Sequence, residues 1–339
     1  YELPNNTAYN ETCAAIANVY WNYRMFLLHG DSKYIDVLEK TLYNGLISGV
    51  GLDGRSFFYT NAMEIRNSFT HPDIERERSG WFECSCCPTN VCRFVPAIPG
   101  YMYAQKENEL FVNLFISSTA EVMINNKPIQ VTQQNNYPWE GNLAFSINTA
   151  KPVSFRVNLR IPGWAENQAI PSALYKFEQT SNARPELKIN GEPVAYEIRN
   201  GYAVIDRVWK KGDKLELNLP MEVKRVIADA NIKNDNGKVA LQRGPIMYCA
   251  EWADNNGKAS NIILPAGTVF TTGFRPTLLK GVMTLNATAP VVQIEDDESI
   301  RTEKRQVTFI PYCTWANRGK GEMMVWFPAQ VKDLEILSR

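Results

Sequence analysis

The sequence predicts an α+β protein of several domains, with helices in about the first 100 residues and strands in most of the rest. Apolar residues recur at helical spacing in the first part, and after Gly100 they alternate with polar residues as in half-buried strands. Because helices come first and strands follow, separate domains are expected instead of interleaved βαβ units. The expected domain ranges are 1–102, 103–225 and 226–339.

The first range is predicted to begin with an antiparallel pair of helices. A first helix follows the polar start at Asn6 and carries Ala14, Ile16, Val19, Tyr20, Tyr23 and Phe26. Asp31 follows a His-Gly break and is expected to cap a second helix, which ends before Gly49. A short strand is expected at residues 56–61, and Pro88 is expected to open a further helix through residues 91–95.

The two later ranges are predicted to be antiparallel β-sandwich domains. Residues 109–116 are strand-like, and residues 153–161 and 214–220 alternate strictly between apolar and polar side chains. The Asn-Gly pairs at 190–191 and 200–201 separate apolar runs, which is the strongest short signal for a hairpin. A polar stretch at 231–237 marks a boundary, and four more strands are expected at 238–242, 244–249, 306–310 and 322–327.

The composition excludes several classes of partner. The chain has 36 Lys and Arg residues against 36 Asp and Glu residues, so no nucleic-acid stripe is expected. No apolar run reaches the roughly 18 residues of a membrane span. The first residues, YELPN, show no leader and therefore do not fix the compartment. Bacterial periplasm and cytoplasm are the two expectations, with the periplasm favoured.

The seven cysteines are distributed unevenly. Cys84, Cys86, Cys87 and Cys92 lie within nine residues, whereas a disulfide scaffold would spread its cysteines through a much smaller chain. Clustered thiols of this kind are typically metal ligands or reactive groups, and buried small apolar residues are the alternative. Their spacing matches no common zinc finger.

A second segment can complete a ligand set. Glu11 and Cys13 lie two residues apart at the expected start of the first helix, where free backbone N–H groups favour anions. Spacing alone leaves an equal alternative, in which Glu11 is a first-turn helix acid and Cys13 a core residue.

These segments together resemble glycoside hydrolase family 127, the β-L-arabinofuranosidase family, and its relative family 146. The resemblance rests on ETCA at 11–14 and CSCCPTN at 84–90. Supporting matches are LEKTLYN at 38–44, SFFY at 56–59, VALQRGP at 239–245 and WANRG at 315–319. They occur in the family's order across nearly the whole chain.

The resemblance implies a fold and a set of site residues. The fold is the C-terminal part of an (α/α)6 barrel followed by β-sandwich domains. The implied zinc ligands are Glu11, Cys13, Cys86 and Cys87, with Cys86 also acting as the nucleophile. Glu39 and Tyr59 match positions that line the sugar pocket, whereas Cys84 and Cys92 are expected only to support packing.

The implied function is a retaining glycosidase that releases terminal β-L-arabinofuranosyl or related furanosyl residues from a plant-type oligosaccharide or glycan. The family's acid/base is a glutamate upstream of Tyr1, so the chain is expected to be the C-terminal portion of a longer enzyme. Its first partner is then the missing N-terminal part of the same barrel. The alternative is a non-catalytic, zinc-stabilised carbohydrate-binding or structural module. A thiol redox protein is disfavoured because Cys-x-x-Cys beside a βαβ pattern is missing.

Overall fold

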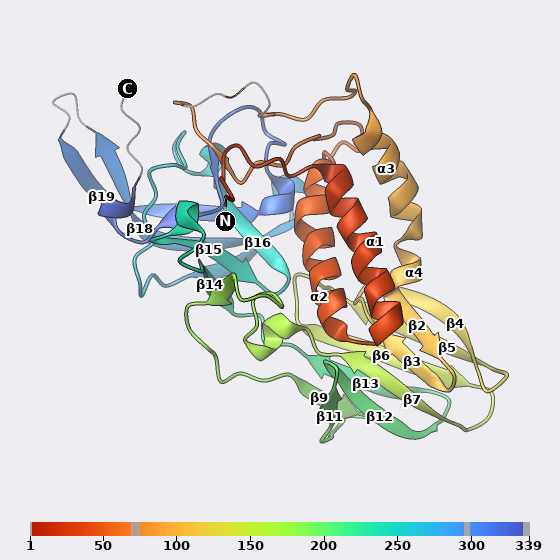
Figure 1. Cartoon of the computed structure of the whole chain (residues 1–339). Coiled ribbons are helices and arrows are strands. Elements are labelled where there is room, and N and C mark those ends of the chain that lie inside the picture. Colours follow the sequence, from red (N-terminus) through yellow and green to blue (C-terminus); the bar gives the residue numbers. More distant parts are fainter. Residues whose placement is uncertain (1, 69–70, 72–74, 295–298, 335–339) are drawn as a thin grey trace.

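The computed structural model describes residues 2–68, 71, 75–294 and 299–334. It begins with a helical layer, whose longer helices lie side by side (Figure 1). The helices are α1 (Thr12–His29), α2 (Ser32–Thr41), α3 (Cys86–Phe94) and the short α4 (Pro99–Met102). Their buried residues form one cluster that includes Ile16, Val19, Phe26, Leu38 and Phe94. No helix in the described ranges is long and apolar enough to cross a membrane.

The predicted helix pair is confirmed, together with its turn. Gly30 ends α1 in the left-handed conformation with φ of 65°, and its N–H donates to the carbonyl of Phe26. The Asp31 side chain then caps α2 by accepting the backbone N–H of Lys33 at 3.0 Å. A single π-helical turn (Leu42–Leu46) and a 3-10 turn (Ile47–Gly49) extend α2 before the chain leaves the helical layer.

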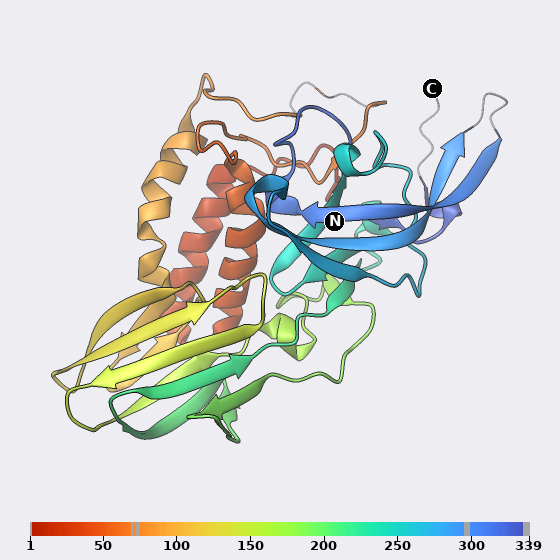
Figure 2. The same cartoon turned by 180° about the vertical axis from the view of Figure 1, so that it is seen from behind.

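Two sheets lie against the far end of the helices (Figures 1 and 2). One has the order β11-β12-β7-β3-β2, with β2 (Tyr103–Lys106), β3 (Glu109–Val112), β7 (Val153–Arg160), β11 (Glu197–Arg199) and β12 (Tyr202–Trp209). The other has the order β10-β9-β13-β6-β5-β4, with β4 (Ser118–Ile124), β5 (Lys127–Asn135), β6 (Asn142–Thr149), β9 (Glu186–Ile189), β10 (Glu192–Pro193) and β13 (Asp213–Asn218). Neighbours are antiparallel except β3 and β7, which are parallel.

Both sheets contribute to a single hydrophobic cluster. Inward residues such as Val131 and Phe145 from one sheet share it with Phe155 and Val157 from the other. Both Asn-Gly hairpins form, and Asn190 and Asn200 adopt positive φ values of 54° and 48° at the two turns. The apolar alternation along residues 153–161 therefore predicted the buried face correctly.

A ten-stranded sheet makes up the rest of the described chain. Its main path is β17-β18-β19-β16-β15-β14-β8. The bounds are β8 (Tyr175–Phe177), β14 (Val223–Ala228), β15 (Lys238–Arg243), β16 (Ile246–Glu251), β17 (Thr271–Arg275), β18 (Val282–Ile294) and β19 (Ile300–Pro311). Beside this path lie β1 (Glu64–Ile65), β20 (Met323–Met324) and β21 (Phe327–Pro328).

The sheets do not follow the predicted domain ranges. β8 comes from the middle range but pairs with β14, and β1 comes from the helical range but pairs with β20. The predicted boundary between residues 225 and 226 falls inside β14. Strand pairing therefore connects the three ranges, and the predicted domain boundaries stay predictions.

Four local predictions need correction. The strand predicted at 322–327 is divided into β20 and β21 by a bend at residues 325–326. Residues 56–61 form only isolated bridges, between Val50 and Phe57, Phe57 and Ser79, and Glu11 and Thr60. The strand predicted at 109–116 ends at Val112. α3 begins at Cys86, so Pro88 lies within its first turn, where a missing N–H costs nothing, and does not open the helix.

A buried ion network joins the helical layer to the first sheet. The Arg160 side chain, fully buried in β7, contacts the Asp36 carboxylate at 2.6 Å and pairs closely with Glu39, both on α2. Its Nε also donates to the Asn113 carbonyl at 2.6 Å, and the Tyr137 hydroxyl donates to Glu39 at 2.8 Å. One buried guanidinium is therefore shared by two carboxylates of α2.

We expect Arg160→Met to lower the free energy of unfolding by about 3–5 kcal/mol, because both carboxylates lose their compensating charge. The matched control is Arg199→Met, which breaks a surface ion pair with Glu197 and is expected to change the free energy of unfolding far less, because water screens exposed pairs. Denaturant titrations of both variants measure the difference. Equal costs would contradict the role assigned to the network.

Burial raises the pKa of Asp36 to about 6, against the opposing effect of Arg160. The folded protein then binds a proton that the unfolded chain, with an Asp pKa of about 3.9, releases. This contribution to stability is full below about pH 4 and is lost as the pH rises through about 6. We therefore expect the thermal midpoint of the wild type, measured relative to that of Asp36→Asn, to decrease as the pH rises from 4 to 6.5. If the difference between the two thermal midpoints stayed constant or rose over this range, the raised pKa of Asp36 would be contradicted.

Candidate metal centre

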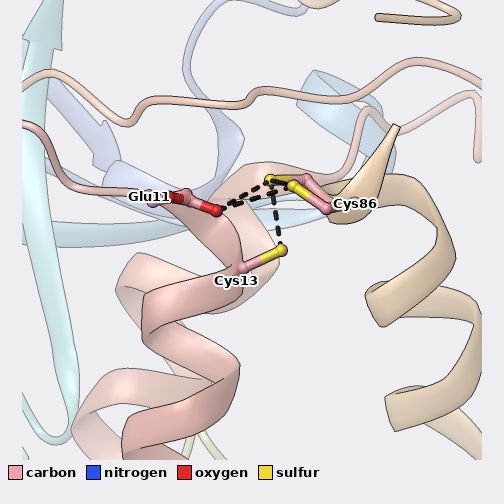
Figure 3. A group of neighbouring side chains, drawn as sticks. Glu11, Cys13 and Cys86 are labelled. Carbon is pink, nitrogen blue, oxygen red and sulfur yellow. Dashed lines mark hydrogen bonds between the residues drawn. The ribbon is translucent and has the colours of Figure 1, made fainter. Parts of the chain in front are cut away.

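Two helix starts, far apart in the sequence, meet at one point of the helical layer. Glu11 is the N-cap residue of α1 and Cys13 lies in its first turn, while Cys86 and Cys87 are the first two residues of α3. Figure 3 shows the side chains of Glu11, Cys13 and Cys86 pointing toward one another from the two helices. One ligand atom from each of the four residues lies within 4.8 Å of all the others.

The distances in this cluster suit a tetrahedral ion. The sulfur of Cys87 lies 3.5 Å from that of Cys13 and 3.9 Å from that of Cys86. Oε1 of Glu11 lies 3.6 Å from the Cys86 sulfur and 4.0 Å from the Cys87 sulfur. A zinc ion about 2.3 Å from tetrahedral thiolates separates their sulfurs by about 3.8 Å. These four distances lie close to that spacing, so the donor set suits such an ion.

The loop of residues 58–60 fixes the start of α1. The backbone N–H of Thr12 donates to the Tyr59 carbonyl at 2.9 Å, and the Thr12 hydroxyl donates to the Phe58 carbonyl at 2.8 Å. Glu11 and Thr60 form an isolated antiparallel bridge. Because Thr12 is fully buried, Glu11 and Cys13 on either side of it have little freedom to move.

Asn90 supports the cluster from α3, although the sequence had not suggested it. Its side-chain amide donates to the Cys13 sulfur at 2.9 Å and so links α3 to α1. Asn90 lies four residues after Cys86, on the same face of a helix. That spacing within the CCPTN motif is the signal that could have identified it.

The cluster treats its three thiols differently. Burial acts to raise the pKa of the Cys86 thiol, but hydrogen bonds from Tyr59 and from the Cys13 thiol outweigh it, and the pKa is lowered. Burial raises the pKa of Cys13 and of Cys87. Cys87 is completely buried, whereas Cys86 is partly accessible. Cys86 is therefore the thiol of the cluster that is both accessible and acidified.

The two predicted sugar-pocket residues lie in different surroundings. Tyr59 adjoins the cluster, since its carbonyl oxygen is 4.0 Å from the Cys87 sulfur and its ring contacts Tyr9 and Phe82 edge-on. Glu39 is buried in the ion network with Arg160 and does not line the cavity described below. A structural role accounts for its position, and its contact with substrate stays a prediction.

The other cysteines lie apart from the ligand set. Cys84 and Cys92 are exposed, so the expected packing role is corrected for both. Cys249 and Cys313 are buried in the β-sheet part of the chain, and none of the seven cysteines, all of them described, forms a disulfide.

A cavity of about 470 Å³ opens beside the cluster. Its wall is largely apolar, with polar groups from Asn10, Glu11, Lys40 and Asn61. Trp326, between β20 and β21, also lines it. A largely apolar space with a few converging polar groups is the usual form of a small-molecule site.

Comparisons with known proteins cover nearly the whole chain. Residues 1–100 match a family model described as the β-L-arabinofuranosidase GH127 catalytic domain. Residues 109–221 match the GH127 middle domain, and residues 223–328 match the glycoside hydrolase family 127 C-terminal domain. The three matches follow one another in sequence order.

Individual relatives agree with these matches. A non-reducing end β-L-arabinofuranosidase of Bifidobacterium longum is 34% identical over 349 residues, covering 96% of this chain and 50% of the relative. A solved GH127 β-arabinofuranosidase is 44% identical with a TM-score of 0.93, covering 99% of this chain and 52% of that one. A GH127 β-L-arabinofuranosidase from Geobacillus stearothermophilus T6 is 39% identical with a TM-score of 0.87, at 96% and 51% coverage. The chain thus spans about half the length of the relatives it matches.

We expect the complete protein to carry one tightly bound divalent metal ion, and Cys13→Ser and Cys87→Ser each to weaken its binding by more than about 100-fold. That loss exceeds the roughly 10- to 100-fold typical of removing a group outside the ligand shell. Cys92→Ser, an exposed thiol on α3, is the matched control and should bind normally. Metal analysis after competition with a chelator measures all three. Equal retention by all three variants would show that these thiols are not ligands.

Proposed function

This chain belongs to glycoside hydrolase family 127, and on that premise we propose that it supplies the nucleophile and zinc ligands of a retaining glycoside hydrolase. The substrate proposed is a terminal β-L-arabinofuranosyl or related furanosyl residue on a plant-type oligosaccharide or glycan. The observation that carries the proposal is the convergence of one carboxylate and three thiols at two helix starts.

In this proposal Glu11, Cys13, Cys86 and Cys87 hold the zinc ion. When bound, zinc keeps coordinating thiols deprotonated at neutral pH and so supplies a sulfur nucleophile. The remaining chemistry belongs to the side chains. Glu11, Cys13 and Cys87 fix the direction of the Cys86 sulfur, and their negative charge keeps that sulfur electron-rich.

Cys86 is the residue proposed to attack the sugar. Its sulfur forms a bond to the anomeric carbon while the bond from that carbon to the glycosidic oxygen breaks, and the oxygen leaves with a proton from an acid. Water, deprotonated by the same group, then replaces the sulfur at the anomeric carbon. Each step inverts the carbon, so the released sugar keeps its configuration.

Two further groups complete the proposed site. The acid/base is a glutamate in the part of the protein that precedes Tyr1. Tyr59 is proposed to contact the sugar, because it lies beside Cys86. Its carbonyl also accepts the backbone N–H of Thr12 at the start of α1. The cavity beside Glu11 would receive the substrate. A periplasmic location is part of the same proposal.

The decisive experiment traps the sugar on sulfur. The complete protein, loaded with zinc, is treated with an epoxide analogue of β-L-arabinofuranose and analysed by peptide mass mapping. We expect one adduct, on Cys86, and the product of normal turnover to retain its anomeric configuration by NMR. The reason is that Cys86 is partly accessible to the reagent, whereas Cys87 is completely buried.

Cys84→Ser is the matched control, because Cys84 is an exposed thiol two residues from Cys86 that lies outside the ligand set. It should label normally and keep most of its activity, whereas Cys86→Ser should lose at least about 1,000-fold in kcat. A zinc-stabilised module without catalysis would show no adduct. Labelling of Cys84 or Cys92 in place of Cys86 would also refute the assignment.

A further inference from the structure

A carboxylate outside the ligand set holds the loop on which the cluster rests. One oxygen of Glu75, Oε2, accepts the backbone N–H of Tyr59 at 2.6 Å and that of Thr60 at 3.1 Å. A single acceptor therefore fixes two consecutive peptide groups. Glu75 is not one of the four residues whose ligand atoms converge, so it acts on the cluster only through this backbone.

The two residues that Glu75 holds touch both helix starts. The Tyr59 carbonyl accepts the Thr12 N–H at 2.9 Å and lies 4.0 Å from the Cys87 sulfur. Thr60 forms the bridge to Glu11. A movement of this short segment would therefore shift ligands on α1 and α3 together.

We propose that Glu75 is a positioning residue that sets the metal affinity of the cluster by clamping the Tyr59–Thr60 backbone against the starts of α1 and α3. This inference rests on the proposed metal site. Hydrogen bonds to a carboxylate are about twice as strong as neutral ones, and losing the acceptor leaves two N–H groups without it. Groups outside the ligand shell that orient ligands typically change metal affinity about 10- to 100-fold.

Glu77 offers a matched control on the same segment. It lies two residues along the chain, is 55% exposed and forms a surface pair with Lys320 at 2.7 Å. Glu77→Gln removes the same charge from the same stretch without touching the Tyr59–Thr60 backbone. Glu75→Gln keeps an oxygen acceptor without the charge, and Glu75→Ala removes both.

The test uses the complete protein, stripped of metal and titrated with Co²⁺, whose absorption bands report thiolate coordination and geometry. Zinc affinity is measured in parallel by competition with a chelator. We expect Glu75→Ala to weaken binding of both ions about 10- to 100-fold and to alter the cobalt spectrum at saturation. Glu75→Gln should recover about half of that loss on a logarithmic scale, so that a loss of about threefold or more remains, and Glu77→Gln should match the wild type.

The outcomes separate this inference from the proposed function. If the wild type and Glu77→Gln take up no cobalt or zinc, the metal site fails and the role of Glu75 fails with it. If both bind normally and Glu75→Ala binds equally well with an unchanged spectrum, only the clamp is wrong. A lower thermal midpoint of metal-free Glu75→Ala with unchanged affinity likewise refutes positioning. Should Glu75→Ala not fold, Glu75→Gln decides, with a threefold or greater loss expected and equality with Glu77→Gln refuting the clamp.

Discussion

The structure depends on holding two helix N-termini against each other at one point. Left alone, each start exposes unpaired N–H groups and so attracts negative charge. Here both starts instead carry ionisable groups that face one another, with Glu11 and Cys13 on one and Cys86 and Cys87 on the other. Thiolates and a carboxylate repel each other at such distances unless a cation lies between them. The fold can keep this arrangement because the buried Thr12 and the Tyr59 carbonyl fix the first helix independently.

The β-sheet part contributes to the site by restraining α2. Arg160 from β7 binds two carboxylates of α2, and Lys40 of the same helix donates to the Gln242 side chain in the third sheet at 2.5 Å. α2 in turn packs against α1, which carries Glu11 and Cys13. Contacts therefore connect the first and the third sheet, through α2, to the helix that carries two of the candidate metal ligands. This connection is made of ion pairs and a hydrogen bond. Because such contacts are directional, they fix the orientation of α2 as well as its position.

Sequence reasoning was reliable where the signal is local. The helix pair around Gly30 and the hairpins at Asn190 and Asn200 follow from backbone preferences of a few residues, and all three form. Residues 56–61 failed because their apolar run looks like a strand but meets no extended partner, only single bridges. Pro88 was misplaced because a proline is tolerated anywhere in the first turn, so it locates a helix start only approximately.

The candidate site was predictable only in part. No spacing rule joins Cys13 to Cys86, and only the resemblance to a family did so before the structure brought them together. Asn90 and Glu75 escaped notice because their roles are hydrogen bonds across folded space. Glu39 was predicted to contact the sugar, but the sequence did not reveal its ion pair with Arg160, which lies 121 residues away.

The pairing of β8 with β14 has a consequence for any attempt to separate the later parts of this chain. β8 covers what would otherwise be the open flank of β14, and it is supplied from residues 175–177. A fragment starting at residue 223 would leave that flank bare, with its peptide groups ready to recruit a strand from a neighbouring molecule. Such a fragment would associate with copies of itself, so the residues from 223 onward do not form an independent domain.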